Sequence, residues 1–193
     1  MLKTDKMLRF IPLLLLIAIL TGSCAAIKKD TKVENCGFPQ SWSGNWEGEL
    51  KIFTQKGEVQ HLPMEVEIYR VDSSDNRFHF ALIYGEDKKS GRRPYQLIVK
   101  DPSKGLYVND EMNGILMEEY FIGNKLYCWF EVSGTQLLST FEKKTDVMYF
   151  EIIAGSSIPS STSGGVKYEG EDIPVVKSFS VKNVQRAVLK KKK

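Results

Sequence analysis

Apolar and polar residues alternate with a period of two from Trp46 to Ala154, which is typical of β-strands rather than helices. Turn-forming pairs such as Asn113-Gly114 and Gly123-Asn124 interrupt the alternation, because Gly and Asn adopt the positive φ that tight hairpins need. The pattern predicts nine strands, over residues 46–52, 64–68, 78–84, 95–100, 106–109, 115–122, 125–133, 136–142 and 147–154.

The predicted strands favour an all-β fold, because this region contains no stretch with the period of an amphipathic helix. Antiparallel strands joined by short hairpins leave two exposed edges unless the sheet closes on itself. We therefore expect a single antiparallel up-and-down β-barrel with an apolar interior and a charged exterior.

The N-terminus has the organisation of a secretory signal. Three basic residues precede an apolar run over residues 10–20, which is shorter than the roughly 20 residues that span a bilayer. The sequence Leu20-Thr21-Gly22-Ser23-Cys24 follows and resembles a bacterial lipobox. The resemblance implies cleavage before Cys24, a lipid on its thiol, and, because Ala25 is not an aspartate, a place in the outer membrane. The alternative is an ordinary signal peptide cut nearby, with Cys24 as a plain thiol.

The flanking segments divide the chain into five parts. We expect a signal peptide over residues 1–23, a polar tether over 24–37, the barrel over 38–154 and a flexible Ser/Gly-rich loop over 155–172. Residues 173–193 either add a strand or form a flexible basic tail. The C-terminal part of the chain is the basic one: eight Lys or Arg and three acids lie from Lys167 onward, whereas the whole chain has a net charge of +3.

A Gly44-x-Trp46 motif opens the first predicted strand and follows the aromatic residues Phe38 and Trp42. It resembles the opening signature of the lipocalins and their calycin relatives. That resemblance implies an eight- or ten-stranded barrel in which Gly44 and Trp46 close one end and a basic side chain from late in the chain covers the tryptophan. The candidates for that cover are Lys143, Lys144 and Arg186.

Aromatic residues in the strands are candidates for a ligand site. We expect Phe78, Phe80, Tyr84, Tyr95 and Trp129 to line a cavity for a small apolar ligand. The alternative is that these side chains fill the interior by themselves. Alternation does not decide which face of residues 115–122 is inside, because both faces are apolar.

The two cysteines after Cys24 are Cys36 and Cys128, which are candidates for a disulfide in an oxidising compartment; a buried free thiol is the alternative. The adjacent acids Glu118 and Glu119 point to opposite faces of a strand and are expected to be solvated.

No catalytic, phosphate-binding or metal-ligand motif is present, so we expect no enzyme activity, metal or cofactor. The basic segment 88–93 is expected to be an exposed hairpin tip, with no nucleic acid as partner. The sequence thus predicts a membrane-anchored envelope lipoprotein that binds a small apolar ligand. The alternative is a non-catalytic scaffold with a filled barrel that contacts an envelope protein.

Overall fold

A computed structural model describes residues 37–193 except residues 73 and 75. The expected signal peptide, Cys24, Cys36 and almost all of the expected tether lie outside the described residues. The fold is therefore given for the barrel unit alone.

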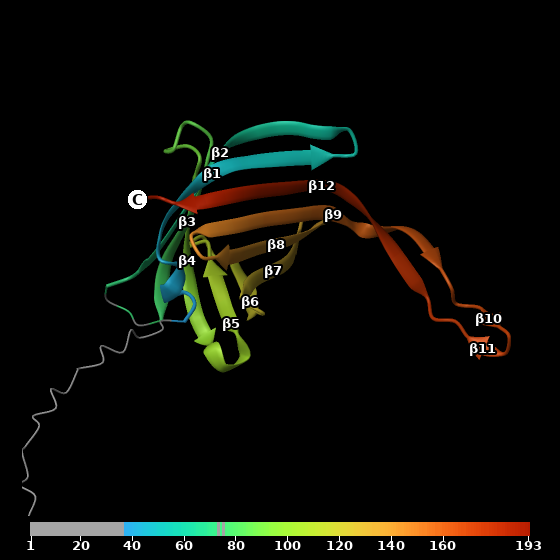
Figure 1. The fold of residues 1–193 in the computed structure, drawn as a ribbon. Coiled ribbons are helices and arrows are strands. Elements are labelled where there is room, and N and C mark those ends of the chain that lie inside the picture. Colours follow the sequence, from blue (N-terminus) through green and yellow to red (C-terminus); the bar gives the residue numbers. More distant parts are fainter. Residues whose placement is uncertain (1–36, 73, 75) are drawn as a thin grey trace, which may run out of the picture. The chain divides into compact units, whose positions relative to one another are not determined.

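Ten antiparallel strands close into one barrel, and β2 to β8 each pair with the strands before and after them in the chain (Figure 1). The strand β12 closes the ring between β9 and β1. The predicted all-β, up-and-down barrel is confirmed. The barrel strands are β1 (Gly44–Thr54), β2 (Gly57–Arg70), β3 (Arg77–Tyr84), β4 (Arg92–Asp101), β5 (Leu106–Asp110), β6 (Leu116–Ile122), β7 (Lys125–Val132), β8 (Thr135–Lys144), β9 (Val147–Ser163) and β12 (Val176–Lys191).

Each of the nine predicted strands overlaps one of the strands β1 to β9. The flexible loop expected from residue 155 was wrong in its first part, because residues 155–163 continue β9. Of the two alternatives for residues 173–193, the structure has the added strand and not the flexible extension, since residues 176–191 form the tenth strand. The reason is long-range pairing: β12 lies opposite β9 along Val176↔Ser163 to Lys190↔Val147. In this ladder the backbone N–H and C=O groups of the two strands bond to each other, whereas in a flexible loop they would bond to water.

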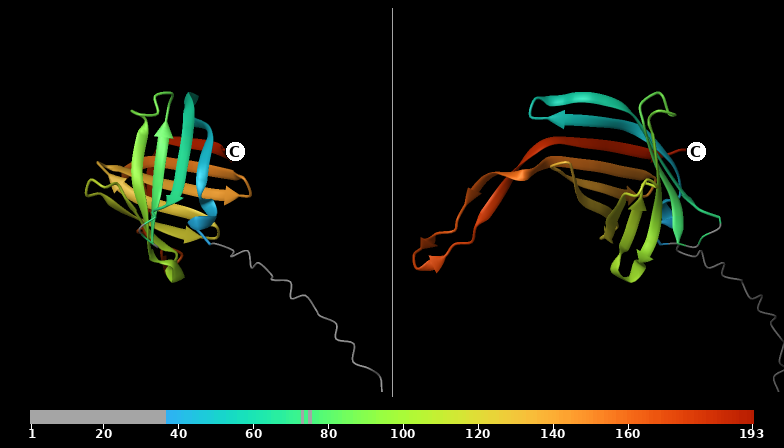
Figure 2. Two further views of the ribbon diagram at one scale, coloured as in Figure 1. Left: turned by 90° about the vertical axis from the view of Figure 1, so that its left-hand side faces the viewer. Right: turned by 180° about the vertical axis from the view of Figure 1, so that it is seen from behind.

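Beyond the barrel, β9 and β12 continue together as a two-stranded arm (Figures 1 and 2). The short strands β10 (Lys167–Tyr168) and β11 (Glu171–Asp172) form its tip. The arm exposes both of its faces, which is why its sequence lacks the regular alternation of the barrel strands.

Trp46 is fully buried at the end of the barrel where β1 begins. Its Nε1 donates a hydrogen bond to the Trp42 carbonyl at 3.0 Å, and Trp42 ends the 3-10 helix η1 (Gln40–Trp42). The basic cover is Lys191, whose Nζ lies 5.6 Å from the Trp46 ring. The candidates Lys143, Lys144 and Arg186 were wrong, because β12 is a barrel strand and its register places Lys191 opposite Trp46. Gly44, with φ 135°, adopts a conformation that favours glycine.

An aromatic cluster packs at the same end of the barrel. The Phe38 and Phe121 rings stack with centroids 4.4 Å apart, and Trp42 and Tyr107 meet Phe38 edge-on. This end is therefore plugged. The up-and-down topology places the β3–β4, β5–β6 and β7–β8 connections and the arm at the opposite end, which we call the open end.

Candidate functional site

A cavity of about 110 Å³ lies inside the barrel, displaced toward the open end. All the strands from β3 to β9 contribute to its wall, which is mostly apolar and aromatic. The lining residues are Phe80, Leu82, Tyr84, Tyr95, Asn109, Glu111, Met117, Glu119, Cys128, Phe130, Ser139, Phe141 and Ile152.

A small polar cluster interrupts this wall. Glu119 on β6 and Asn109 on β5 are only 3% and 6% exposed, and the Asn109 Nδ2 donates to Glu119 Oε1 at 3.3 Å. Cys128 on β7 lies directly opposite Glu119 in the register. Two acceptor atoms in this cluster, Asn109 Oδ1 and Glu119 Oε2, have no hydrogen-bond partner among the described residues. Such buried, unpaired polar atoms are rare in folded proteins and require an explanation.

Burial sets the protonation of this cluster. Loss of solvation raises the pKa of Glu119 to about 8, although the hydrogen bond from Asn109 opposes the rise. Burial, with a smaller contribution from the Glu119 charge, raises the pKa of the Cys128 thiol to about 12. No Lys or Arg lines the cavity in the described part of the chain. At neutral pH the site therefore holds a protonated acid and a protonated thiol.

The structure places three of the five expected ligand residues on the cavity: Phe80, Tyr84 and Tyr95. Phe78 is buried in the packed core but does not line the cavity. Trp129 is 73% exposed on the outer face. The prediction that Trp129 lines the interior was wrong, because successive strand residues alternate and Cys128 faces inward.

The sequence did not identify Asn109 or Glu119 as site residues. Glu119 was expected to be solvated, and that was wrong: it faces inward beside Met117 on β6, while Glu118 faces outward and accepts from Tyr120. Every second residue of β6, namely Met117, Glu119 and Phe121, faces inward, and this alternation could have indicated the placement of Glu119. The outward residues of the same strand are also mostly apolar, so the sequence did not show which face is inside. Among the residues that the structure describes, Cys128 is buried and forms no disulfide. Cys36 lies outside the described residues, so the candidate Cys36–Cys128 disulfide stays a prediction.

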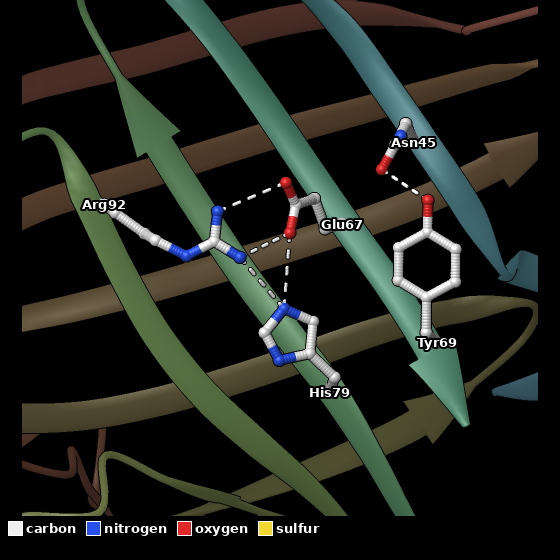
Figure 3. Close-up of polar contacts among 5 residues, drawn as sticks. All are labelled: Asn45, Glu67, Tyr69, His79 and Arg92. Atoms are coloured by element: carbon white, nitrogen blue, oxygen red, sulfur yellow. Dashed lines mark hydrogen bonds and ion pairs between the residues drawn. The ribbon is translucent and has the colours of Figure 1, made fainter. Parts of the chain in front are cut away.

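A second polar cluster lies on the outer face of the barrel (Figure 3). Arg92 donates to both carboxylate oxygens of Glu67, at 3.2 and 2.5 Å, and His79 Nε2 lies 3.3 Å from Glu67 Oε2 and 3.1 Å from Arg92 Nη2. The hydrogen bond from Arg92 holds the pKa of Glu67 below its ordinary value. Arg92, expected in an exposed hairpin tip, is thus tied to the sheet. The neighbouring Tyr69 hydroxyl donates to Asn45 Oδ1.

The charges of this outer cluster are paired with one another, so it is a structural network rather than a binding site. Within the described residues, no group of three or more His, Cys, Asp or Glu side chains is arranged to hold a metal ion. Larger hollows on the outer surface, such as one of about 440 Å³ beside β1 and β12, are bordered by charged side chains including Lys51 and Arg186. The interior cavity is therefore the stronger candidate site.

Residues 37–193, leaving aside 73 and 75, contain no helix with the length and apolar character of a membrane span.

Comparison with known proteins finds a similarity of fold. No protein-family model and no curated protein sequence matches this chain. The solved structure of the S-type phycobiliprotein lyase CPES from Guillardia theta is similar, with a TM-score of 0.52 and 8% sequence identity over 80% of this chain and 90% of that one. The described part of this chain therefore has the fold of a closed, lipocalin-like β-barrel.

Proposed function

We propose that this protein binds a small, mostly apolar molecule inside its barrel, through the end opposite Trp46. The observation that carries the proposal is the interior cavity itself, an aromatic-lined space of about 110 Å³ with two unpartnered polar atoms in its wall. Ligand sites in proteins combine these features: an apolar, concave surface and a few placed polar groups. The likeness of the barrel to that of a lyase is consistent with this role.

The volume limits the occupant. A dry cavity of about 150 Å³ holds benzene, and sites for drug-sized ligands measure about 300–1,000 Å³. The space here, about 110 Å³, accommodates one compact group or the end of a slender chain. The closed half of the barrel is filled by its own side chains, as the filled-barrel alternative expected, since Trp46, Val66 and Leu189 are fully buried there. A longer ligand would therefore leave part of its length at the open end.

Binding is favoured over catalysis. The matched structure is that of a lyase, and a lyase-type reaction in this cavity would draw on Glu119 and Cys128. Only the thiolate is a strong nucleophile, and a pKa of about 12 keeps the Cys128 thiol protonated at neutral pH. A Cys128→Ala variant that retains ligand binding would agree with a passive role, whereas loss of a measurable turnover on this substitution would support catalysis.

We further propose that the protein is lipid-anchored through Cys24 and resides in the outer membrane. The support is the sequence Leu20-Thr21-Gly22-Ser23-Cys24 after an apolar run. Two or more acyl chains hold a protein stably on a membrane, whereas one chain binds only marginally. Cys24→Ser, expressed in a bacterium, should abolish labelling by a fatty-acid probe and release the protein from the membrane fraction. Unchanged labelling would refute the anchor.

Ligand binding can be tested with neutral apolar probes. A series of linear alcohols from butanol to octanol should raise the melting temperature of the purified protein, with an optimum set by the length of the cavity. Ser139→Leu fills the cavity from β8 and should abolish the effect. Gln136→Leu, on the outer face of the same strand, is the matched control and should retain it. Absence of any stabilisation by any alcohol would refute the proposal.

A further inference from the structure

We infer that the molecule bound in the cavity carries a primary ammonium group, which Glu119 Oε2 and Asn109 Oδ1 accept as a hydrogen-bond donor. The inference rests on the proposed function, because it assumes that the cavity binds a small molecule, and it adds the chemical class of that molecule.

The first argument is the direction of the unpartnered hydrogen bonds. The amide nitrogen of Asn109 is already used on Glu119 Oε1, so the amide presents its oxygen to the site. The second oxygen of Glu119 is also unpartnered. An amide oxygen accepts only, and an ionised carboxylate accepts only. When Glu119 is ionised, a ligand with two or three N–H groups on one atom satisfies both oxygens at once, whereas an ether, ketone or carboxylate has no hydrogen to donate to Asn109 Oδ1.

The second argument is the charge of the cavity wall. Its two ionisable carboxyl groups are Glu119, deep in the site, and Glu111, at the open end of β5, and no Lys or Arg is among the lining residues. Arg93 does not line the cavity, but its charge acts near the rim, where it opposes the rise of the pKa values of Tyr84 and Tyr95 that burial causes. Inside the cavity an ammonium ion therefore meets carboxyl groups and no cation, whereas a carboxylate finds no cation to pair with.

The third argument is the proton balance of binding. The other titratable groups that line the cavity with Glu119 are Cys128 on β7, Tyr84 on β3, Tyr95 on β4 and Glu111 directly after β5, while β8 and β9 add only Ser139, Phe141 and Ile152. None of these groups is a cation that neutralises an ionised Glu119. An alkylammonium ion, with a pKa near 10 as in lysine, arrives charged at neutral pH. Its binding ionises Glu119, and the carboxyl proton leaves to the solvent.

Three probes with the same six-carbon chain separate the possibilities: hexylamine, hexanol and hexanoate. The cavity has room for about four groups the size of a water molecule, so the head group and the first carbons fit and the rest of the chain extends toward the open end. Isothermal titration at pH 7 should give hexylamine the tightest binding, by roughly tenfold or more over hexanol, because hydrogen bonds to a charged group are the stronger ones. Hexanoate should be the weakest.

Repeating the hexylamine titration in buffers of different ionisation enthalpy counts the protons. We expect close to one proton released at pH 7 and nearly none at pH 9, because Glu119, with a pKa of about 8, has by then lost most of its proton. Hexanol should release none at either pH. Glu119→Gln should reduce hexylamine binding to the level of hexanol and abolish proton release. Glu118→Gln, its outward-facing neighbour, should change neither.

The outcomes distinguish this inference from the proposed function. Equal binding of hexylamine and hexanol, tighter binding of hexanoate, or hexylamine binding without proton release would overturn the ammonium assignment and leave the ligand-binding role intact. Failure of all three probes to bind would overturn both. The comparison of probes on the unsubstituted protein decides the matter even if Glu119→Gln does not fold.

Discussion

Replacing Glu119 with Gln should stabilise the empty protein at neutral pH and change how its stability depends on pH. Gln has nearly the same shape and keeps an oxygen that accepts from Asn109 Nδ2, so packing is preserved. It removes the need to keep an acid protonated inside the barrel. The unpartnered Glu119 Oε2 then becomes the position of a neutral amide group.

The size of the effect follows from the two pKa values of Glu119. The unfolded chain loses this proton near its ordinary pKa of 4.5, whereas the folded chain holds it until about 8. The folded state therefore binds more protons across this window, and the free energy of unfolding falls as pH rises through it. At 1.36 kcal/mol per pH unit, the loss reaches about 3 kcal/mol at pH 7 and is below about 1 kcal/mol at pH 5. Glu119→Gln should regain these amounts.

Urea unfolding of the two proteins at several pH values between 5 and 9 measures the difference directly. The advantage of Glu119→Gln should grow from pH 5 to pH 8 and then level off. Glu118→Gln, which removes a carboxylate from the outer face of the same strand, is the matched control and should not reproduce this trend. Parallel stability profiles for the unsubstituted protein and Glu119→Gln would refute the burial argument and, with it, the proton count of the ammonium site.

Four further outcomes are expected. Trp46→Ala should lower the free energy of unfolding by about 3–5 kcal/mol in urea unfolding, because it empties a fully buried site; a loss under about 1 kcal/mol would contradict its packing role. Glu67→Gln should cost about 1–2 kcal/mol at neutral pH, because it weakens a charged hydrogen-bond pair with Arg92. Because the pKa of Glu67 is lowered, this difference should be present above pH 4.5 and disappear as pH falls through the depressed value; a difference independent of pH would refute it. Termination after Lys182 removes the part of β12 that joins β1 to β9 and should abolish the β-sheet circular dichroism signal; a folded, monomeric product would contradict the role of β12. Cys128 should resist iodoacetamide at pH 7.5 and react in urea, and rapid alkylation of the native protein, followed by mass spectrometry, would disprove its burial.

The candidate site was only partly predictable from the sequence. Phe80, Tyr84 and Tyr95 lie on strands in which apolar and polar residues alternate clearly. Their inward direction, and so their place on the cavity, could therefore be expected. Glu119 and Trp129 could not be placed in this way, because the strands that carry them are apolar on both faces. Which face of such a strand is inside depends on its neighbours in the sheet, and those neighbours are set by pairing across the barrel.

The local alternation of residues 46–154 was enough to predict the strands β1 to β9 and the all-β class, because a period of two is a property of each segment by itself. The tertiary structure alone decided that residues 176–191 complete the barrel, that Lys191 covers Trp46, and that a carboxylic acid lies in the interior. Each of these depends on register between segments far apart in the chain. The closing strand β12 joins β1 across more than a hundred residues, and no local pattern carries that information.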